Sequence, residues 1–194
     1  MARNNDTRER VLGTAAALFQ RQGYSGTGLN QVLAESNAPK GSLYFHFPGG
    51  KEQLAAEAIA RSGGELGERI AAVVRDAPGP RAALAGIAAL FADNLVVSDF
   101  HGGCPVATVA LEAAADSEPI RASCDLTYTA WLDGLALALS RWGVAAPAAA
   151  PLATLIVSSL QGAILLAKVR HDTAALHEVG DQLGTLIEQT VSAR

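Results

Sequence analysis

The spacing of apolar residues predicts helices along almost the whole chain. Apolar side chains recur every three or four positions, which is the period of an amphipathic helix and not of a strand. Glycine- and proline-rich breaks interrupt the pattern at Gly23, Ala77–Pro80, His101–Pro105 and Ala145–Pro151. We therefore predict an all-α fold with helices over residues 7–22, 28–35, 51–76, 81–98, 106–115, 118–142, 152–170 and 173–192, and a short helix that starts at Pro39.

The first three predicted helices form a small unit with its own core. Asp6 or Thr7 can cap the first helix, and Gly23 stands where a helix usually ends. Thr27 is placed to cap the second helix. The side chains expected to face inward are Val11, Leu12, Ala15, Leu18, Phe19, Leu29, Val32, Leu33 and Leu43, with Phe45 and Phe47 packing beneath the third helix.

A tight turn separates the second and third helices. Asn37 lies at its centre, and asparagine is one of the few non-glycine residues that tolerate positive φ. Pro39 suits the first position of a helix of about seven residues, because its missing N–H has no partner there. Two helices around such a turn are typical of a helix-turn-helix DNA reader.

The third helix carries groups that suit contact with DNA. Lys40 offers a charge, Ser42 a hydroxyl and Tyr44 a phenol that can reach phosphate, while Gly41 lets the backbone approach closely. Lys51 lies in the first turn of the next helix, where the dipole disfavours a cation. A DNA phosphate would gain from both Lys51 and that dipole.

Charge is distributed unevenly. Residues 1–51 contain six Lys or Arg and three acids, a net charge of +3. Because the whole chain has a net charge of −4, the remaining residues have a net charge of −7. A basic head on an acidic body is expected if only the head meets phosphate.

The body reads as a long apolar helical domain, and its last two helices suggest a dimer. The helix at 152–170 is apolar nearly all round, so it must be buried on two sides. Two such C-terminal helices from each chain would form a four-helix homodimer interface. Two-fold dimers also read palindromic half-sites, which one short helix cannot do alone.

Composition excludes several other classes of protein. The 194 residues are 49% hydrophobic but only 5% aromatic, a mixture that favours helices. We find no apolar run of the roughly 18 to 20 residues that span a bilayer, and no signal-peptide core at the N-terminus. Cys104 and Cys124 show no metal-binding spacing, so we expect no metal, no cofactor and a cytoplasmic location.

The stretch from Thr27 to Leu54, TGLNQVLAESNAPKGSLYFHFPGGKEQL, resembles the helix-turn-helix of the TetR (tetracycline-repressor) family. The residues in register, without a gap, are Thr27, Leu29, Val32, Lys40, Gly41, Ser42, Leu43, Tyr44, His46, Phe47, Lys51, Glu52 and Leu54. Gly28 replaces the usual second Thr of the family, so we expect one phosphate contact of the family pattern to be absent, and Asn37 replaces the turn glycine.

The resemblance implies roles for these residues. Lys40, Gly41 and Ser42 would face the major groove, and Thr27, Tyr44, His46 and Lys51 would hold the DNA backbone. It also implies a head over residues 1–50 that binds DNA and a body over residues 51–194 that binds ligand and dimerises.

The body resembles a subgroup of that family. The stretch Gly102–Val106 and the following Leu111–Ala113 are similar to the C-terminal domain of LmrA/YxaF-type TetR regulators, which implies aromatic, drug-like ligands. We expect a largely apolar ligand between the connecting helix and helices that bear Phe91, Cys104, Tyr128, Trp131 and Gln161.

These observations favour a dimeric, ligand-responsive transcriptional repressor that binds a palindromic operator. Two alternatives are a DNA-binding activator or architectural protein without a ligand, and a thiol redox sensor acting through Cys104. Enzyme activity is not expected, because the chain has no catalytic motif such as HExxH, GxSxG or a phosphate loop.

Overall fold

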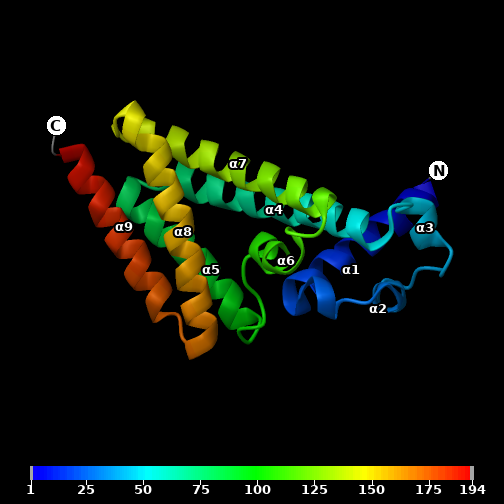
Figure 1. Cartoon of the computed structure of the whole chain (residues 1–194). Coiled ribbons are helices and arrows are strands. Elements are labelled where there is room, and N and C mark those ends of the chain that lie inside the picture. Colours follow the sequence, from blue (N-terminus) through cyan, green and yellow to red (C-terminus); the bar gives the residue numbers. More distant parts are fainter. Residues whose placement is uncertain (1, 193–194) are drawn as a thin grey trace. The chain divides into compact units, whose positions relative to one another are not determined.

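The computed structural model describes residues 2–192, with side chains from Asp6 onward. Over that range it contains helices and no strand, which confirms the all-α prediction (Figure 1). The helices are α1 (Ala2–Gly26), α2 (Leu29–Glu35), α3 (Ser42–His46), α4 (Gly50–Asp76), α5 (Pro80–Val97), α6 (Pro105–Ala113), α7 (Glu118–Arg141), α8 (Ala146–Arg170) and α9 (Ala174–Ser192).

The chain divides into two compact units. The first consists of Met1–Glu65 and Pro105–Thr127, and the second of Leu66–Cys104 and Tyr128–Arg194. The boundary between Glu65 and Leu66 falls inside α4, and the boundary between Thr127 and Tyr128 falls inside α7. These two helices therefore each contribute to both units. The helix-turn-helix lies entirely in the first unit.

In the first unit α1 packs against α2, α3 and α6. Its core is made by the inward positions of these helices, and most of the predicted set is buried, including Val11, Leu12, Ala15, Leu18, Phe19, Val32, Leu33, Leu43 and Phe47. Phe45 is an exception, because 70% of its surface is exposed. The prediction that Phe45 packs beneath α3 is therefore wrong.

The start of α1 also differs from the prediction. The helix begins at Ala2, so Asp6 and Thr7 lie inside it and do not cap it. Asp6 instead forms an ion pair with Arg10 one turn later. Gly23 does interrupt the helix, with φ 76° and ψ 178°, a region of backbone space that is essentially reserved for glycine.

The chain around the helix-turn-helix departs from the prediction at two helix starts. Gly28, not Thr27, is the N-cap of α2, and no side chain caps that helix. α3 begins at Ser42 and has five residues, while Pro39 belongs to the preceding turn and its carbonyl accepts the Ser42 N–H at 2.9 Å. The predicted turn at Asn37 is confirmed by its φ of 51°.

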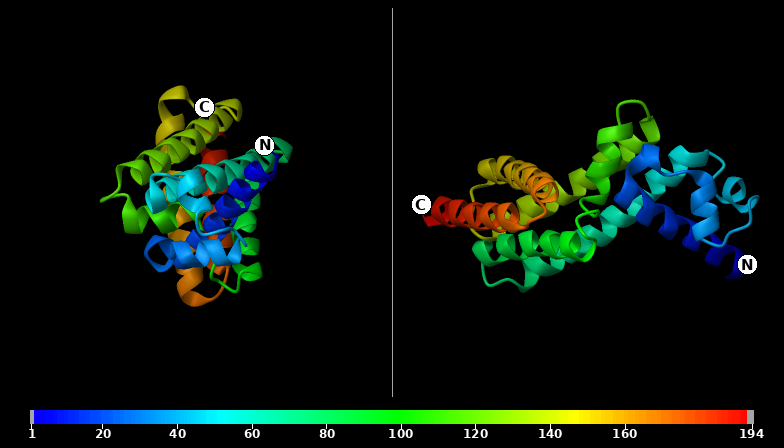
Figure 2. Two further views of the ribbon diagram at one scale, coloured as in Figure 1. Left: turned by 90° about the vertical axis from the view of Figure 1, so that its right-hand side faces the viewer. Right: turned by 90° about the horizontal axis from the view of Figure 1, so that it is seen from below.

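In the second unit α9 packs along α5 and α8 (Figure 2). Two glycines of α9 permit the close approach to α5: a Cβ at Gly180 would lie 2.7 Å from the Ala88 Cβ, and one at Gly184 would lie 2.8 Å from the Arg81 Cα. Arg81 also donates two hydrogen bonds, of 2.9 and 2.6 Å, to Asp181 on α9.

α8 is longer than predicted. It begins at Ala146, so the expected connector Ala145–Pro151 is mostly helical. Pro147 lies in the first turn, where its missing N–H has no intrahelical partner. Pro151 lies inside the helix, where proline normally kinks or breaks it, and this is why the sequence pattern placed the helix start too late.

Two helices, α5 and α8, are long and apolar enough to cross a membrane by length and composition alone. This finding differs from the expectation that no apolar run is long enough to span a bilayer. This criterion is weak, because the core helix of a globular protein also meets it. α5 is in fact a core helix, since it buries Ala83, Leu84, Ile87, Ala88, Phe91, Ala92 and Leu95.

Candidate nucleic-acid interface

The turn before α3 presents a short polar segment to solvent. Ala38 closes the turn by donating its N–H to the Leu33 carbonyl at 3.0 Å. Lys40 and Gly41 are exposed, and Ser42 is half-buried. The Ser42 hydroxyl lies 2.7 Å from the Pro39 carbonyl, to which it donates a hydrogen bond, and its oxygen can still accept one.

α3 is held to the unit by one side and exposes the other. Leu43 and Phe47 are fully buried, whereas Tyr44 is 65% exposed. The structure thus brings Lys40, Gly41, Ser42 and Tyr44 together on one short segment. A segment of this kind can enter the major groove of DNA with its exposed side chains facing bases and phosphates.

Two of the predicted contact residues are less accessible. Thr27 is 1% exposed, its hydroxyl donates to the Gly23 carbonyl at 2.7 Å, and its N–H donates to the Tyr24 carbonyl. In this conformation neither group is available to a phosphate. His46 is half-buried, and its Nε2 atom is shielded from solvent without a hydrogen-bond partner among the described residues.

Lys51 lies in the first turn of α4, as predicted, and contacts an aromatic ring. Its ammonium lies 4.3 Å from the centroid of Tyr24. Partial burial lowers the pKa of the Lys51 ammonium, and the Glu112 carboxylate on α6 acts in the opposite direction. Burial raises the pKa of Tyr24, and the charge of Glu52 adds to that rise.

A side-chain network that was not predicted from the sequence holds the turn after α3. Arg8 on α1 pairs with Glu57 on α4, and Glu57 accepts a hydrogen bond of 2.9 Å from the Gln53 amide. Gln53 in turn accepts the Gly49 N–H at 2.8 Å. The Arg8 guanidinium also lies 5.2 Å from the Phe47 ring centroid. The four-residue spacing of Gln53 and Glu57 was visible in the sequence, but Arg8 is too distant along the chain to suggest the pairing.

The five residues predicted to line a ligand site all belong to the second unit. Phe91 and Cys104 are buried, and the other three are half-buried, namely Tyr128, Trp131 and Gln161. The Tyr128 and Trp131 rings meet edge-on with centroids 5.4 Å apart. A Cβ at Gly67 would lie 2.9 Å from the Trp131 indole nitrogen, so the α4 backbone approaches this ring closely.

Residues 2–192 contain no group of three or more His, Cys, Asp or Glu side chains arranged to hold a metal. Cys104 and Cys124 are not joined in a disulfide, and both are buried. A redox-sensing thiol needs access to solvent, so the burial of Cys104 does not favour the redox-sensor alternative.

Comparison with known proteins agrees with this geometry. Residues 11–58, which include the helix-turn-helix, match the family described as bacterial regulatory proteins, tetR family. The chain belongs to this family of transcriptional regulators. Within it, residues 80–182 match the C-terminal domain described as transcriptional regulator LmrA/YxaF-like, so the body belongs to that subgroup.

Individual relatives support the same assignment over most of the chain. The chain is 37% identical to the transcriptional regulator LmrA of Bacillus subtilis over 89% of the chain and 92% of the relative. It is also 37% identical to the regulator YxaF of the same organism, over 97% and 99%. A TetR transcriptional regulator from Chloroflexus aurantiacus has a similar solved structure, with 28% identity, a TM-score of 0.83 and 98% of each chain covered.

The family assignment also fixes the class of protein. The matched families and relatives are transcriptional regulators and not enzymes. Regulators of the TetR family bind DNA and act as homodimers with small-molecule effectors. The exposed surface around α3 is therefore a candidate DNA interface.

Proposed function

We propose that the protein is a homodimeric repressor that binds a palindromic operator and releases it when a largely apolar or aromatic ligand binds. Residues 1–50 form the DNA-binding head, and residues 51–194 form the body that binds the ligand and dimerises. The protein acts in the cytoplasm, where its operator lies. The activator and architectural alternatives lack a specific observation in their favour.

The main support for DNA binding is the presence of glycine at position 41. Its φ of −75° and ψ of −16° suit any residue, and apart from its two chain neighbours no residue has an atom within 4 Å of the place where a Cβ would be. Nothing inside the chain therefore requires glycine there, although glycine weakens a helical segment. Close contact between DNA and the backbone at Gly41 would explain why this position has no side chain.

The proposed contacts divide into two sets. Lys40, Gly41 and Ser42 face base edges in the major groove, and Tyr44, His46 and Lys51 approach phosphates. Thr27 is omitted because its hydroxyl and N–H are both used inside the protein.

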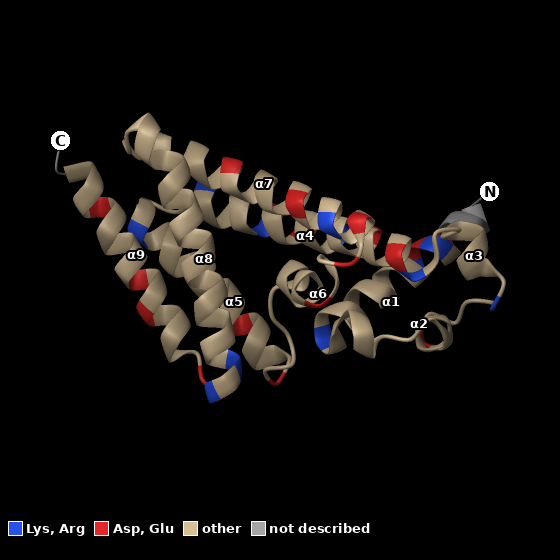
Figure 3. Cartoon of the chain, viewed as in Figure 1, with Lys and Arg blue, Asp and Glu red and all other residues tan. Residues whose placement is uncertain are grey.

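The surface of α8 supports dimerisation through α8 and α9. Ile156, Leu160 and Ile164 face the core, but a second row remains exposed at heptad spacing: Leu155, Ser158, Gly162, Leu165 and Val169. Figure 3 shows that the charges of α8 are confined to its C-terminal end, where Lys168 and Arg170 lie. An uncharged apolar row with small central residues suits close packing against the same row of a second copy.

The ligand binds in the body, and its binding changes the DNA affinity of the head. We propose Phe91, Cys104, Tyr128, Trp131 and Gln161 as ligand contacts, since buried aromatic groups with a few polar groups are typical of small-molecule sites. α4 is continuous from Lys51 to the second unit, so a tilt of α4 would change the spacing of the two recognition helices. A 100-fold loss of operator affinity needs about 2.7 kcal/mol of preferential ligand binding to one conformation.

Fluorescence anisotropy tests the proposal directly. The purified full chain is titrated against DNA flanking its own gene and against random DNA over a series of salt concentrations, and aromatic compounds are then screened for release. We expect tight, flank-specific binding that a ligand weakens. Equal, salt-sensitive binding to both DNAs would instead support the architectural alternative.

A further inference from the structure

Phe45 occupies the centre of the exposed face of α3. Successive residues of an α-helix are about 100° apart, so Phe45 lies opposite the direction shared by the buried Leu43 and Phe47. It follows Gly41 by four positions and Ser42 by three, and Gly41 already has helical dihedral angles. Phe45 therefore shares a face with the two residues proposed to enter the major groove.

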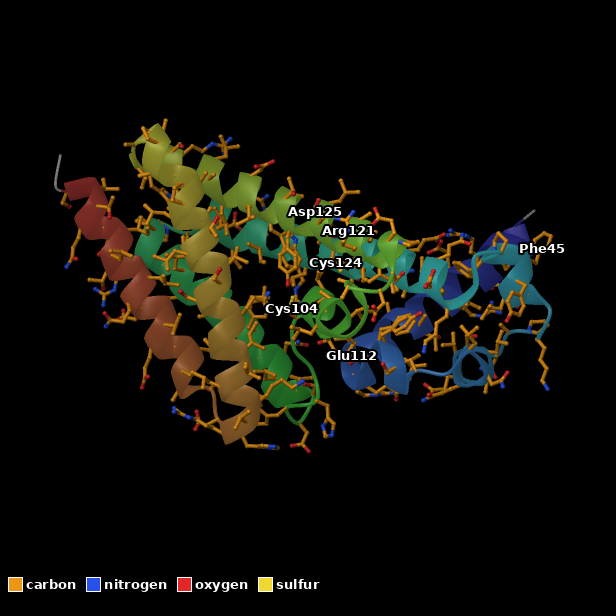
Figure 4. All side chains as sticks on the ribbon, in the orientation of Figure 1. Phe45, Cys104, Glu112, Arg121, Cys124 and Asp125 are labelled. Carbon is orange, nitrogen blue, oxygen red and sulfur yellow. The ribbon has the colours of Figure 1, made fainter. Side chains whose placement is uncertain are left out.

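The phenyl ring is both exposed and supported. It is 70% exposed, although the burial of a phenylalanine side chain stabilises a protein by about 1.5–3 kcal/mol. The His46 imidazole meets it edge-on, with centroids 5.0 Å apart and an interplanar angle of 82°. Figure 4 shows Phe45 on α3. A single exposed apolar residue is common on protein surfaces. The distinctive feature of Phe45 is its direction, which lies between those of Gly41 and Ser42 around the helix axis.

The chemistry of the ring limits what it can recognise. A phenyl group has no hydrogen-bond donor or acceptor, so it cannot read the polar pattern of base edges. The apolar group that base edges present in the major groove is the 5-methyl of thymine. On the basis of the DNA-binding function proposed above, we propose that Phe45 is a specificity-determining residue that contacts a thymine methyl group in each operator half-site.

Removal of single methyl groups from the operator tests this assignment. The full-length protein first selects its binding sequence from a random double-stranded library, and each thymine is then replaced in turn by deoxyuridine. We expect one symmetric pair of thymines at which the replacement weakens wild-type binding, by about threefold to tenfold per half-site. Phe45→Ala should bind the thymine and deoxyuridine operators equally, while Phe45→Leu should keep part of the difference.

The outcomes separate this assignment from the proposed function. Specific binding that ignores every deoxyuridine replacement overturns the role of Phe45 and leaves DNA binding intact. Equal sensitivity in Phe45→Ala and wild type also overturns it, because the methyl group is then read by another residue. Failure of the wild type to select any sequence overturns the proposed function together with the role of Phe45. Far-UV circular dichroism of both variants, which change an exposed side chain, verifies that they are folded.

Discussion

The Glu112 carboxylate on α6 accepts a hydrogen bond of 2.8 Å from the backbone N–H of Ser25, at the broken end of α1. This contact depends on a glycine two residues earlier, because a Cβ at position 23 would lie 1.9 Å from a Glu112 oxygen. Burial lowers the pKa of the Lys51 ammonium, and the charge of the same carboxylate opposes that lowering. Both Glu112 and Lys51 lie within the first unit, so one acidic side chain joins α6, the end of α1 and the start of α4.

Gly23→Ala should destabilise the first unit. Alanine is strained at φ 76° and ψ 178°, which costs about 1–3 kcal/mol, and its Cβ would also displace Glu112. Chemical denaturation monitored by circular dichroism measures the change in free energy of unfolding.

Gly13→Ala is the matched control for this variant. Gly13 lies inside α1, and a Cβ there would lie 3.9 Å from the Arg61 guanidinium, an ordinary contact. Its replacement should raise the free energy of unfolding by about 0.5–1 kcal/mol. Equal effects of the two variants would show that neither the backbone conformation of Gly23 nor its contact with Glu112 matters.

Glu112→Gln should strengthen DNA binding at low salt. The amide oxygen can still accept the Ser25 N–H, but the negative charge near Lys51 is removed. A partly exposed charge interaction of this kind contributes about 0.2–1 kcal/mol, so we expect roughly 1.5-fold to fivefold tighter binding that fades as salt rises. Glu68→Gln, which removes an exposed charge elsewhere on α4, serves as the control in the same anisotropy titrations. A change no larger than that of the control would exclude a role for the Glu112 charge.

Much of the fold could be predicted because apolar spacing reports directly on helix faces. The bounds of α4, α5, α7 and α9 lie within two residues of the predicted ranges. The errors fall at helix starts, where one cap or proline residue was taken to mark the boundary. Pro151 suggested a connector but is accommodated inside α8, and Asp6 suggested a cap although the helix begins earlier.

Lys51→Ala should weaken binding to all DNA sequences about equally. The lysine is proposed to meet a phosphate, which carries no sequence information. The slope of log K against log salt should therefore become shallower by about 0.9 per bound subunit. Arg141→Ala, which removes one exposed positive charge at the end of α7, should leave the slope unchanged. An unchanged slope in Lys51→Ala would refute the phosphate contact.

Gly41→Ala should separate stability from DNA binding. The backbone conformation suits alanine, so the free energy of unfolding should stay the same or rise by about 0.4–1 kcal/mol. The added methyl group enters the proposed interface, and we expect about tenfold weaker operator binding. Gly64→Ala, at an exposed helical position with no atom within 4 Å of its Cβ, should stabilise the protein without affecting DNA. Operator binding that survives in Gly41→Ala would remove the main support for the proposed interface.

The candidate DNA surface could be located from the sequence, but not the role of every residue on it. Motif spacing identified Lys40, Gly41 and Tyr44, and the structure exposes all three. Phe45 and Phe47 were both predicted to pack inward, yet residues two apart on a helix face nearly opposite directions. The role of Thr27 could not be predicted either. The hydroxyl of a threonine before a helix can donate to an earlier carbonyl, here that of Gly23, as readily as it accepts an N–H of the following helix.

Leu165→Glu should convert the proposed dimer into a monomer. Leu165 lies within the exposed row on α8 and is 63% exposed in the single chain, so a glutamate there can be solvated without disturbing the core. In a dimer, two carboxylates would be buried without partners in an apolar interface. Their desolvation would cost several kcal/mol of the free energy of dimerisation, so we expect the dimer to dissociate. Sedimentation should show a fall from twice the chain mass to once, with unchanged helicity. Val97→Glu, at an 89% exposed position at the end of α5, should remain dimeric, and a dimeric Leu165→Glu variant would place the interface elsewhere on the chain.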